Sequence, residues 1–268
     1  NLAREYRRLL RGAEHSKSPE DRKRIRKAWE LAVEAHKDMR RRSGEAYIFH
    51  PVAVARICSE EMGLDTTSIV CALLHDTVED TWVTLDDIER MFGKRERIII
   101  DGLTKISGIF DAAQSAQAEN FRKMLLSLSN DIRVILIKIA DRLHNMRTLD
   151  SMKREKQLKI AGETDFMYAP LAHRLGLYAI KSELEDLSLR YRQPEQYAEI
   201  EQKLRKTKAV RTRFINSFAA PIKEALDKEG LKFSIKGRPK SIASIWNKMQ
   251  KQRVSFEDIY DIFAIRII

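Results

Sequence analysis

Apolar residues recur every three or four positions along most of this chain, and few residues interrupt that pattern. Glycine and proline, which break helices most strongly, account for only 10 and 6 of the 268 residues. The spacing predicts helices at residues 19–39, 49–61, 66–79, 84–91, 95–107, 117–129, 131–147, 151–163, 164–189 and 194–229. We therefore expect a mainly α-helical fold.

The pattern changes after Gly230. The segment "LKFSIKG" at 231–237 alternates apolar and polar residues, which is typical of a strand. "SIASIWNKMQKQ" at 241–252 has helical spacing, and "IYDIFAIRII" at 259–268 has the apolar character of a buried strand. The sequence therefore predicts a small α/β region after the helices, with a domain boundary somewhere in 165–220.

The apolar runs exclude a membrane protein of the helical kind. The longest, such as "VILI" at 134–137, are far shorter than the roughly 20 residues of a membrane span, and the polar start has no secretory signal. We expect a cytoplasmic protein without a membrane partner. Cys58 and Cys71 lie inside helical patterns without metal-site spacing, which predicts buried free thiols. The chain starts without methionine and stops in an apolar run, which indicates a piece of a longer protein.

Positive charge is concentrated near the end of the sequence. The formal net charge is +11, and residues 191–268 hold 17 Lys and Arg against 9 Asp and Glu. An excess of this sign favours a polyanionic ligand, either nucleic acid or a phosphorylated nucleotide. A plain solvated helical surface is the alternative interpretation for most individual lysines.

The segment "CALLHDTVED" at 71–80 places four polar side chains directly after an apolar run. On a helix covering 66–79, His75 and Glu79 are four positions apart and Asp76 and Glu79 three, so they share one face. An imidazole beside a carboxylate suits a divalent metal, and Glu79 and Asp80 would lie within reach of a water at that metal. For any one of these residues alone, a surface or capping group is the better interpretation, because buried acids are costly without a partner. For the set together, we favour a metal site.

Two ligands do not complete a metal site, and two other segments offer more. "YIFHP" contains His50 at a helix start, and "IKIADRLHNMRT" contains Asp141 after an apolar helix. Asp141, Asn145 and Thr148 fall on one helical face, so a ligand and two polar substrate contacts would point the same way. Two imidazoles and two carboxylates favour manganese or iron, with zinc possible. A metal of this kind activates water and polarises a phosphoryl oxygen, which predicts a phosphohydrolase.

These segments in this order, preceded by "RRSGEAYI", resemble the hydrolase domain of the RelA/SpoT homologues. These are bifunctional (p)ppGpp synthetase/hydrolases and a branch of the HD-domain phosphohydrolases. "GRPKSIASIWNKM" and "YDIFAIR" resemble the opening of the same family's synthetase domain. The resemblance implies an all-α HD domain at 1–175, a helical connection at 176–220 and the N-terminal part of a truncated α/β synthetase domain at 221–268.

The resemblance also implies roles for individual residues. The manganese ligands would be His50, His75, Asp76 and Asp141. The catalytic residues would be Glu79 and Asp80, which position or activate the attacking water, and Arg41. The substrate-binding residues would be Arg41 and Arg42 near the pyrophosphate and Ser43, Asn145 and Thr148 along the nucleotide. The family commonly has lysine where Arg42 stands, which changes the donor geometry and keeps the charge.

In the part similar to the synthetase, Arg238, Lys240 and Lys248 match positions that contact the phosphates of ATP, and Asp261 matches a magnesium-binding aspartate. A solvated helix side is the alternative for Lys248. The glutamate and the guanosine-binding segment that complete this chemistry lie further downstream in the family. We therefore expect no synthetase activity from this fragment, and a Mg²⁺ requirement only in the complete synthetase domain.

The expected function is Mn²⁺-dependent hydrolysis of the 3′-diphosphate of (p)ppGpp, an alarmone of the stringent response, to GDP or GTP and pyrophosphate. Contact with the ribosome or RNA would come only through C-terminal regions outside this sequence. One alternative is an HD phosphohydrolase of another nucleotide. The other is a regulatory or RNA-binding module with a vestigial HD site, against which the intact His75, Asp76, Glu79 and Asp80 argue.

Overall fold

The computed structural model describes residues 2–112 and 131–267, so the helix predicted at 117–129 lies outside the described residues. The chain separates into two compact units, Asn1–Leu177 and Tyr178–Ile268. The mainly α-helical fold that the apolar spacing predicts is confirmed.

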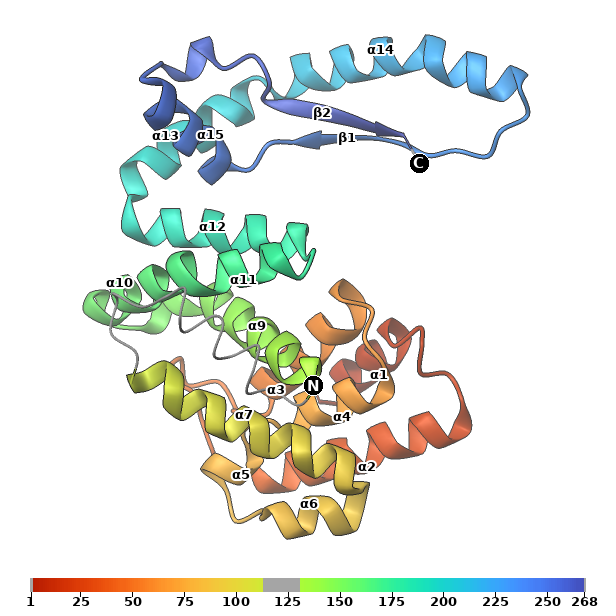
Figure 1. The fold of residues 1–268 in the computed structure, drawn as a ribbon, viewed down its shortest axis with the longest axis vertical. Coiled ribbons are helices and arrows are strands. Elements are labelled where there is room, and N and C mark those ends of the chain that lie inside the picture. The colour runs from red at the N-terminus through yellow and green to blue at the C-terminus, as the bar shows by residue number, and fades with distance from the viewer. Residues whose placement is uncertain (1, 113–130, 268) are drawn as a thin grey trace. The chain divides into compact units, whose positions relative to one another are not determined.

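The described part of the first unit is built from helices (Figure 1). They are α1 (Leu2–Gly12), α2 (Pro19–Ala35), α3 (Phe49–Arg56), the π-helix η1 (Ile57–Glu61), α4 (Thr66–Leu74), α5 (Thr77–Asp80), α6 (Leu85–Phe92), α7 (Lys94–Ala112), α9 (Ile132–Arg147), the 3₁₀ turn η3 (Leu149–Ser151), α10 (Arg154–Glu163), the π-helix η4 (Thr164–Tyr168) and α11 (Ala169–Arg174).

Helix α4 lies at the centre of the core of this unit. All nine of its residues, "TTSIVCALL", are buried, and none of them is charged. It packs against α2, α3 and α7, which explains why its sequence is apolar on every side. Asp65 begins the helix, because its side chain accepts a hydrogen bond from the backbone N–H of Ser68 at 3.0 Å. The most buried helix of the unit therefore ends directly at His75.

The prediction of one continuous helix over 66–79 is wrong, because the backbone turns at His75 and Asp76. Nδ1–H of His75 donates to the carbonyl of Ala72 at 2.8 Å, and Oγ1–H of Thr77 donates to the carbonyl of Leu74 at 2.7 Å. Such side chain to backbone bonds satisfy the last carbonyls of a helix and replace its regular hydrogen bonds. His75 and Glu79 consequently belong to different elements and not to one helical face.

Two longer predicted helices are also interrupted. The segment 164–189 is divided by a turn in which Gly176 has a φ of 75°, a left-handed conformation that commonly follows a helix end. The segment 194–229 is divided at Thr207, whose hydroxyl donates to the carbonyl of Lys203 at 3.1 Å. Apolar periodicity continues across both turns, so it does not reveal them.

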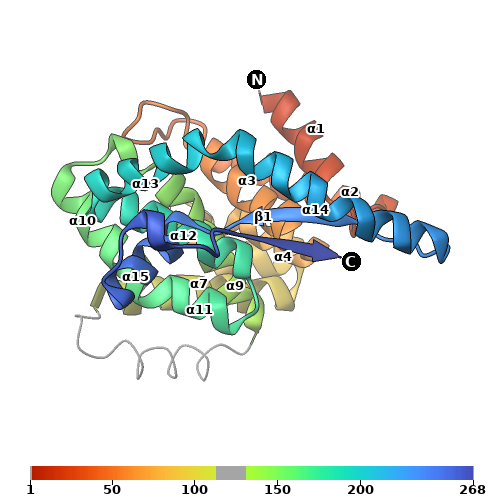
Figure 2. The same ribbon diagram turned by 90° about the horizontal axis from the view of Figure 1, so that it is seen from above.

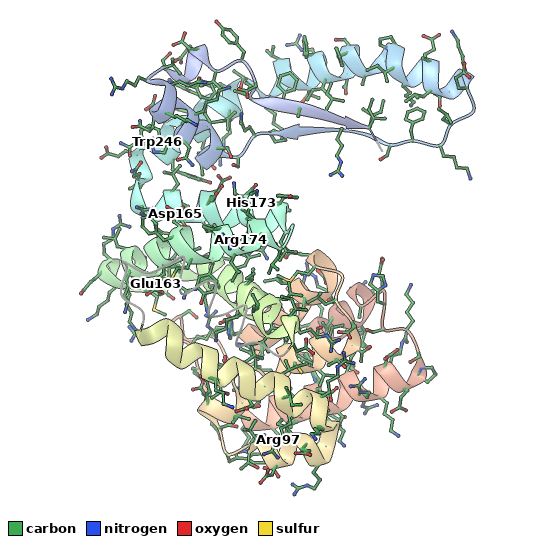
Figure 3. All side chains as sticks on the ribbon, viewed as in Figure 1. Arg97, Glu163, Asp165, His173, Arg174 and Trp246 are labelled. Atoms are coloured by element: carbon green, nitrogen blue, oxygen red, sulfur yellow. The ribbon has the colours of Figure 1, made fainter. Side chains whose placement is uncertain are left out.

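Side-chain ion pairs fix the outer helices of the first unit. Arg97 of α7, labelled in Figure 3, pairs with Asp86 and Glu89 of α6, each at 2.6 Å. Cys58 and Cys71 are buried and free, as expected. Across the described residues, no helix has both the length and the apolar character that a membrane crossing requires.

The second unit combines helices with a hairpin. Its elements are α12 (Tyr178–Arg192), α13 (Pro194–Lys206), α14 (Lys208–Lys228), β1 (Ile235–Pro239), α15 (Ile242–Gln252), the 3₁₀ turn η5 (Phe256–Asp258) and β2 (Phe263–Ile267). The strands pair antiparallel, with Gly237 opposite Ile265. Both views show α14 running along this hairpin (Figures 1 and 2).

Strand β1 overlaps the predicted strand at 231–237, and β2 lies within the predicted strand at 259–268. Each strand is shorter than its prediction. The core of the second unit joins α12, α13, α15 and η5 through Leu189, Ile200, Ile245 and Phe256, with Trp246 packed against them (Figure 3). The carboxylate of Asp186 on α12 accepts a hydrogen bond from the backbone N–H of Ala243 at 2.7 Å. It thereby caps the N-terminus of α15 from a neighbouring helix.

Replacement of this cap should destabilise the second unit. Asp186→Ala leaves the backbone N–H of Ala243, in the first turn of α15, without its acceptor, and loss of a helix cap costs about 0.5–2 kcal/mol. Urea unfolding followed by Trp246 fluorescence, with Trp29 and Trp82 replaced by phenylalanine, measures the change. Asp227→Ala on the exposed side of α14 is the control. Equal midpoints for the two variants would contradict the capping role.

Candidate metal centre

Four side chains from three parts of the first unit converge where α4 ends. Nε2 of His50, on α3, lies 3.5 Å from Oδ2 of Asp76 and 3.2 Å from Oδ1 of Asp141, on α9. Nε2 of His75 lies 3.0 Å and 3.9 Å from the same two oxygens. His50, His75 and Asp76 offer ligand atoms within 4.8 Å of one another, so these residues could hold a metal ion.

The state of His75 fits a cation at this point. Its Nδ1 binds the Ala72 carbonyl, which fixes the ring, while Nε2 is buried and has no hydrogen-bond partner among the described residues. Asp76 lies close to this nitrogen but outside hydrogen-bond geometry. A buried lone pair aimed between two carboxylates is costly in a protein unless a proton or a metal occupies the space.

The pKa values of the cluster also favour a bound cation. Burial alone would lower the pKa of His75, but the carboxylates of Asp76 and Asp141 outweigh it and raise this pKa to about 9. Burial would raise the pKa of Asp76, but His75 and His50 hold it well below its usual range. The site therefore attracts positive charge, and a divalent cation can replace the proton of His75.

His144, one turn after Asp141 on α9, orients the ring of His50. The two Nδ1 atoms lie 2.8 Å apart. Burial above all lowers the pKa of His144 to about 3, so His144 is neutral. A neutral His144 with its proton on Nε2 accepts from Nδ1–H of His50. This tautomer, assigned from the hydrogen bond, leaves the Nε2 lone pair of His50 for a cation.

Asp141 is held by two further side chains of its own helix. Asn145 donates from Nδ2 to Oδ1 of Asp141 at 2.7 Å, and Nζ of Lys138 lies 3.5 Å from Oδ2. Burial would lower the pKa of Lys138, but Asp141 outweighs it, so the pKa is raised and the amine stays charged. Oδ1 of Asp141 consequently faces the two histidines while Oδ2 faces Lys138.

Arg41 joins this network from the loop before α3. Its Nη2 donates to Oδ1 of Asn145 at 2.8 Å and its Nη1 to the hydroxyl of Thr148 at 3.0 Å. A continuous path of hydrogen bonds therefore runs from Arg41 through Asn145 to Asp141. Ser43 accepts weakly from the backbone N–H of Glu45 at 3.4 Å, and Arg42 is exposed on the same loop.

Glu79 and Asp80 lie on α5, exposed at the edge of the cluster. Oδ2 of Asp80 is 3.3 Å from the hydroxyl of Tyr47, which donates to Oδ2 of Asp76 at 2.6 Å. The negative charge of Glu79 acts on Lys138, which places it near the same centre. The structure thus brings together the predicted ligands, the acid pair, Arg41, Asn145 and Thr148.

Three neighbours of the centre were absent from the sequence-based set. They are Tyr47, Lys138 and His144. Tyr47 and His144 lie inside the quoted segments "YIFHP" and "IKIADRLHNMRT", so their nearness to predicted ligands was the available signal. Lys138 is three residues before Asp141, a spacing that puts both on one helical face. None of these signals specifies which atom each side chain contacts.

Three of the four predicted synthetase residues, Lys240, Lys248 and Asp261, lie together in the second unit. Asp261 accepts from Nζ of Lys240 at 2.7 Å and from Nζ of Lys248 at 2.5 Å. These hydrogen bonds and charges hold the pKa of Asp261 well below its usual range. Lys240 and Lys248 are therefore paired with the aspartate and are not simply solvated. Arg238 is on β1, and its side chain lies outside the described residues.

Comparison with known families agrees with this geometry. The HD domain family matches residues 28–178, which contain all four converging side chains. A second family, described as a region found in RelA / SpoT proteins, matches residues 237–268. An all-helical unit with this His/Asp cluster defines an HD-domain protein. Together the two matches show that the chain belongs to the RelA/SpoT family of HD-domain proteins.

Individual relatives are similar over nearly the whole chain. A GTP pyrophosphokinase of Myxococcus xanthus is 46% identical over 91% of this chain and 33% of its own length. The bifunctional (p)ppGpp synthase/hydrolase SpoT of Escherichia coli is 44% identical over 93% of this chain and 36% of its own. The chain thus spans about a third of these relatives. A solved metazoan orthologue of SpoT aligns with 63% of this chain and 96% of its own, at 24% identity and a TM-score of 0.48.

Substitutions in the cluster should separate ligands from other acids. His75→Ala, Asp76→Ala and Asp141→Ala should each lower the content of bound divalent metal in the purified protein, because each removes a donor that faces the centre. Glu79→Gln should keep the wild-type content, as should the control His15→Ala on an exposed loop. Elemental analysis after gel filtration measures the metal. Full occupancy in the first three variants would contradict the ligand set.

Proposed function

We propose that this chain hydrolyses the 3′-diphosphate of (p)ppGpp, giving GDP or GTP and pyrophosphate, with Mn²⁺ as the metal. The observation that carries the proposal is the convergence of His50, His75, Asp76 and Asp141, with the acid pair on one side and Arg41 on another. Two nitrogen and two oxygen donors suit Mn²⁺, Fe²⁺ or Zn²⁺ better than Ca²⁺.

The names of the relatives support the choice of substrate. Besides SpoT of E. coli, the relative from Aquifex aeolicus is named guanosine-3′,5′-bis(diphosphate) 3′-pyrophosphohydrolase and is 41% identical over 93% of this chain. The matched parts of these relatives contain the HD region. We therefore assign the hydrolase activity, and not the synthetase activity, to residues 1–177. A cytoplasmic location also stays a prediction.

The bound metal would polarise the phosphoryl group and make water a stronger nucleophile. The protein supplies the remaining parts. Glu79 and Asp80, exposed beside the cluster, hold the attacking water and take its proton. His144 and Thr148 also line a pocket of about 500 Å³, together with residues of α1 and α3 such as Glu5 and Phe49.

Positive side chains offset the charge that develops on the leaving pyrophosphate. Arg41 uses one N–H of each Nη for Asn145 and Thr148, and its guanidinium has five N–H groups in all, so further donors are left for phosphate oxygens. Arg42, exposed on the same loop, adds a second guanidinium. Because Arg41 is already held in place, it loses little freedom when it binds a phosphate.

Incubation of the purified chain with ppGpp and Mn²⁺ tests the proposal directly. We expect GDP and pyrophosphate, and no turnover after EDTA treatment. A panel containing dGTP, NADP and ppGpp separates the alarmone from other nucleotides, because only an alarmone hydrolase should prefer a 3′-diphosphate. Glu79→Gln should retain metal and lose turnover. Preference for another nucleotide would favour the alternative HD phosphohydrolase.

Arg41→Ala should raise KM and lower kcat/KM for ppGpp. A charge-assisted hydrogen bond to phosphate is worth about 1.5–3 kcal/mol, which corresponds to roughly 10- to 150-fold in kcat/KM. Arg22→Ala, on the exposed side of α2, is the control for loss of one positive charge. Steady-state kinetics at saturating Mn²⁺ gives both constants. Kinetics equal to those of Arg22→Ala would place Arg41 outside the substrate site.

A further inference from the structure

Tyr47 lies just before α3, after the loop that carries Arg41 and Arg42, and its hydroxyl contacts the carboxylates of Asp76 and Asp80. This hydroxyl donates to Oδ2 of Asp76 at 2.6 Å and lies 3.3 Å from Oδ2 of Asp80. The hydroxyl therefore links the side chain of a predicted metal ligand with that of one member of the acid pair.

We propose that Tyr47 is a positioning residue for hydrolysis, which holds Asp80 in register with the metal ligand Asp76. This inference rests on the proposed function, because it assigns Asp80 to the attacking water. Tyr47 itself touches neither the water nor the substrate in this assignment. It acts through the two carboxylates.

A phenol has one hydrogen to donate, and here two acceptors compete for it. Both carboxylate oxygens lie within hydrogen-bond range, at 2.6 Å for Asp76 and 3.3 Å for Asp80, so the hydroxyl can donate to either one and bridges the two.

The ring of Tyr47 is itself held firmly. It stacks on His36 with a centroid distance of 5.0 Å and an interplanar angle of 18°, and it meets the edge of His50 at 5.7 Å. The backbone N–H of Tyr47 donates to the carbonyl of Met39 at 2.9 Å. Packing against two histidines and a backbone hydrogen bond therefore fix the direction of the hydroxyl.

The position of Asp80 leaves its side chain free to rotate unless another group holds it. It ends the four-residue helix α5, where its backbone N–H donates to the carbonyl of Asp76 at 2.9 Å and its side chain is exposed. An exposed carboxylate on so short a helix can adopt several rotamers. The nearby phenol limits them to those directed toward the centre.

Tyr47→Phe tests the proposal, because it removes only the hydroxyl and keeps the ring between His36 and His50. We expect Mn²⁺ affinity, measured by EPR without substrate, to fall about 10-fold, as for other groups that orient a metal ligand. At saturating Mn²⁺, kcat for ppGpp should fall about 10- to 100-fold with KM nearly unchanged. Tyr6→Phe, which alters a tyrosine whose ring lies 4.9 Å from that of Trp29, is the matched control.

A double-mutant cycle identifies the route through Asp80. If Tyr47 acts by placing Asp80, then Tyr47→Phe should lower kcat much less in an Asp80→Ala background than in the wild type. The proposal would be overturned if Tyr47→Phe lowered kcat by the same factor in both backgrounds. Wild-type Mn²⁺ affinity in Tyr47→Phe would also overturn it. If the wild-type chain fails to hydrolyse ppGpp, the proposed function fails instead, and the EPR titration still decides whether Tyr47 supports Asp76.

Discussion

Complete burial of α4 is the constraint on which the candidate site depends. All nine residues of this helix are enclosed by α2, α3 and α7, so its end point is fixed by core packing. His75 and Asp76 follow directly at that end point, and the side-chain bonds of His75 and Thr77 turn the chain there. The packing of the apolar core thus determines the position of the charged cluster. The helices around α4 resist small shifts of it.

Around this fixed point, neighbouring side chains set the charge or the direction of individual ligands. His144 stays neutral and orients His50, and Lys138 stays charged and faces the outer oxygen of Asp141. The neutral neighbour therefore orients a ligand ring, and the charged neighbour balances a carboxylate. The arrangement concentrates negative charge between two imidazole nitrogens, which is the environment that a divalent cation requires. It also joins the loop before α3 to the same centre, through the hydrogen bonds of Arg41 to Asn145 and of Asn145 to Asp141.

Much of this arrangement follows from local sequence, and the rest does not. Apolar spacing identified the helix that carries Asp141 and the apolar run that ends at His75, since burial imposes both patterns. The breaks at His75, Gly176 and Thr207 depend on side-chain bonds or one left-handed residue, which periodicity does not register. The contact of Tyr47 with Asp76 joins residues 47 and 76 through tertiary packing alone. Residue types at a site are thus readable from sequence, whereas their atomic partners are not.

The proposed ligands come from α3, the end of α4 and α9, which are far apart along the chain. A cation held by all of them would tie these segments together much as a covalent cross-link does, and would restrict the unfolded chain by closing two long loops. Free metal concentration and conformational stability would then be thermodynamically linked, so that scarcity of metal would favour the unfolded chain as well as remove the cation from the centre. The cellular supply of the ion would in this way govern the abundance of the folded protein together with its turnover.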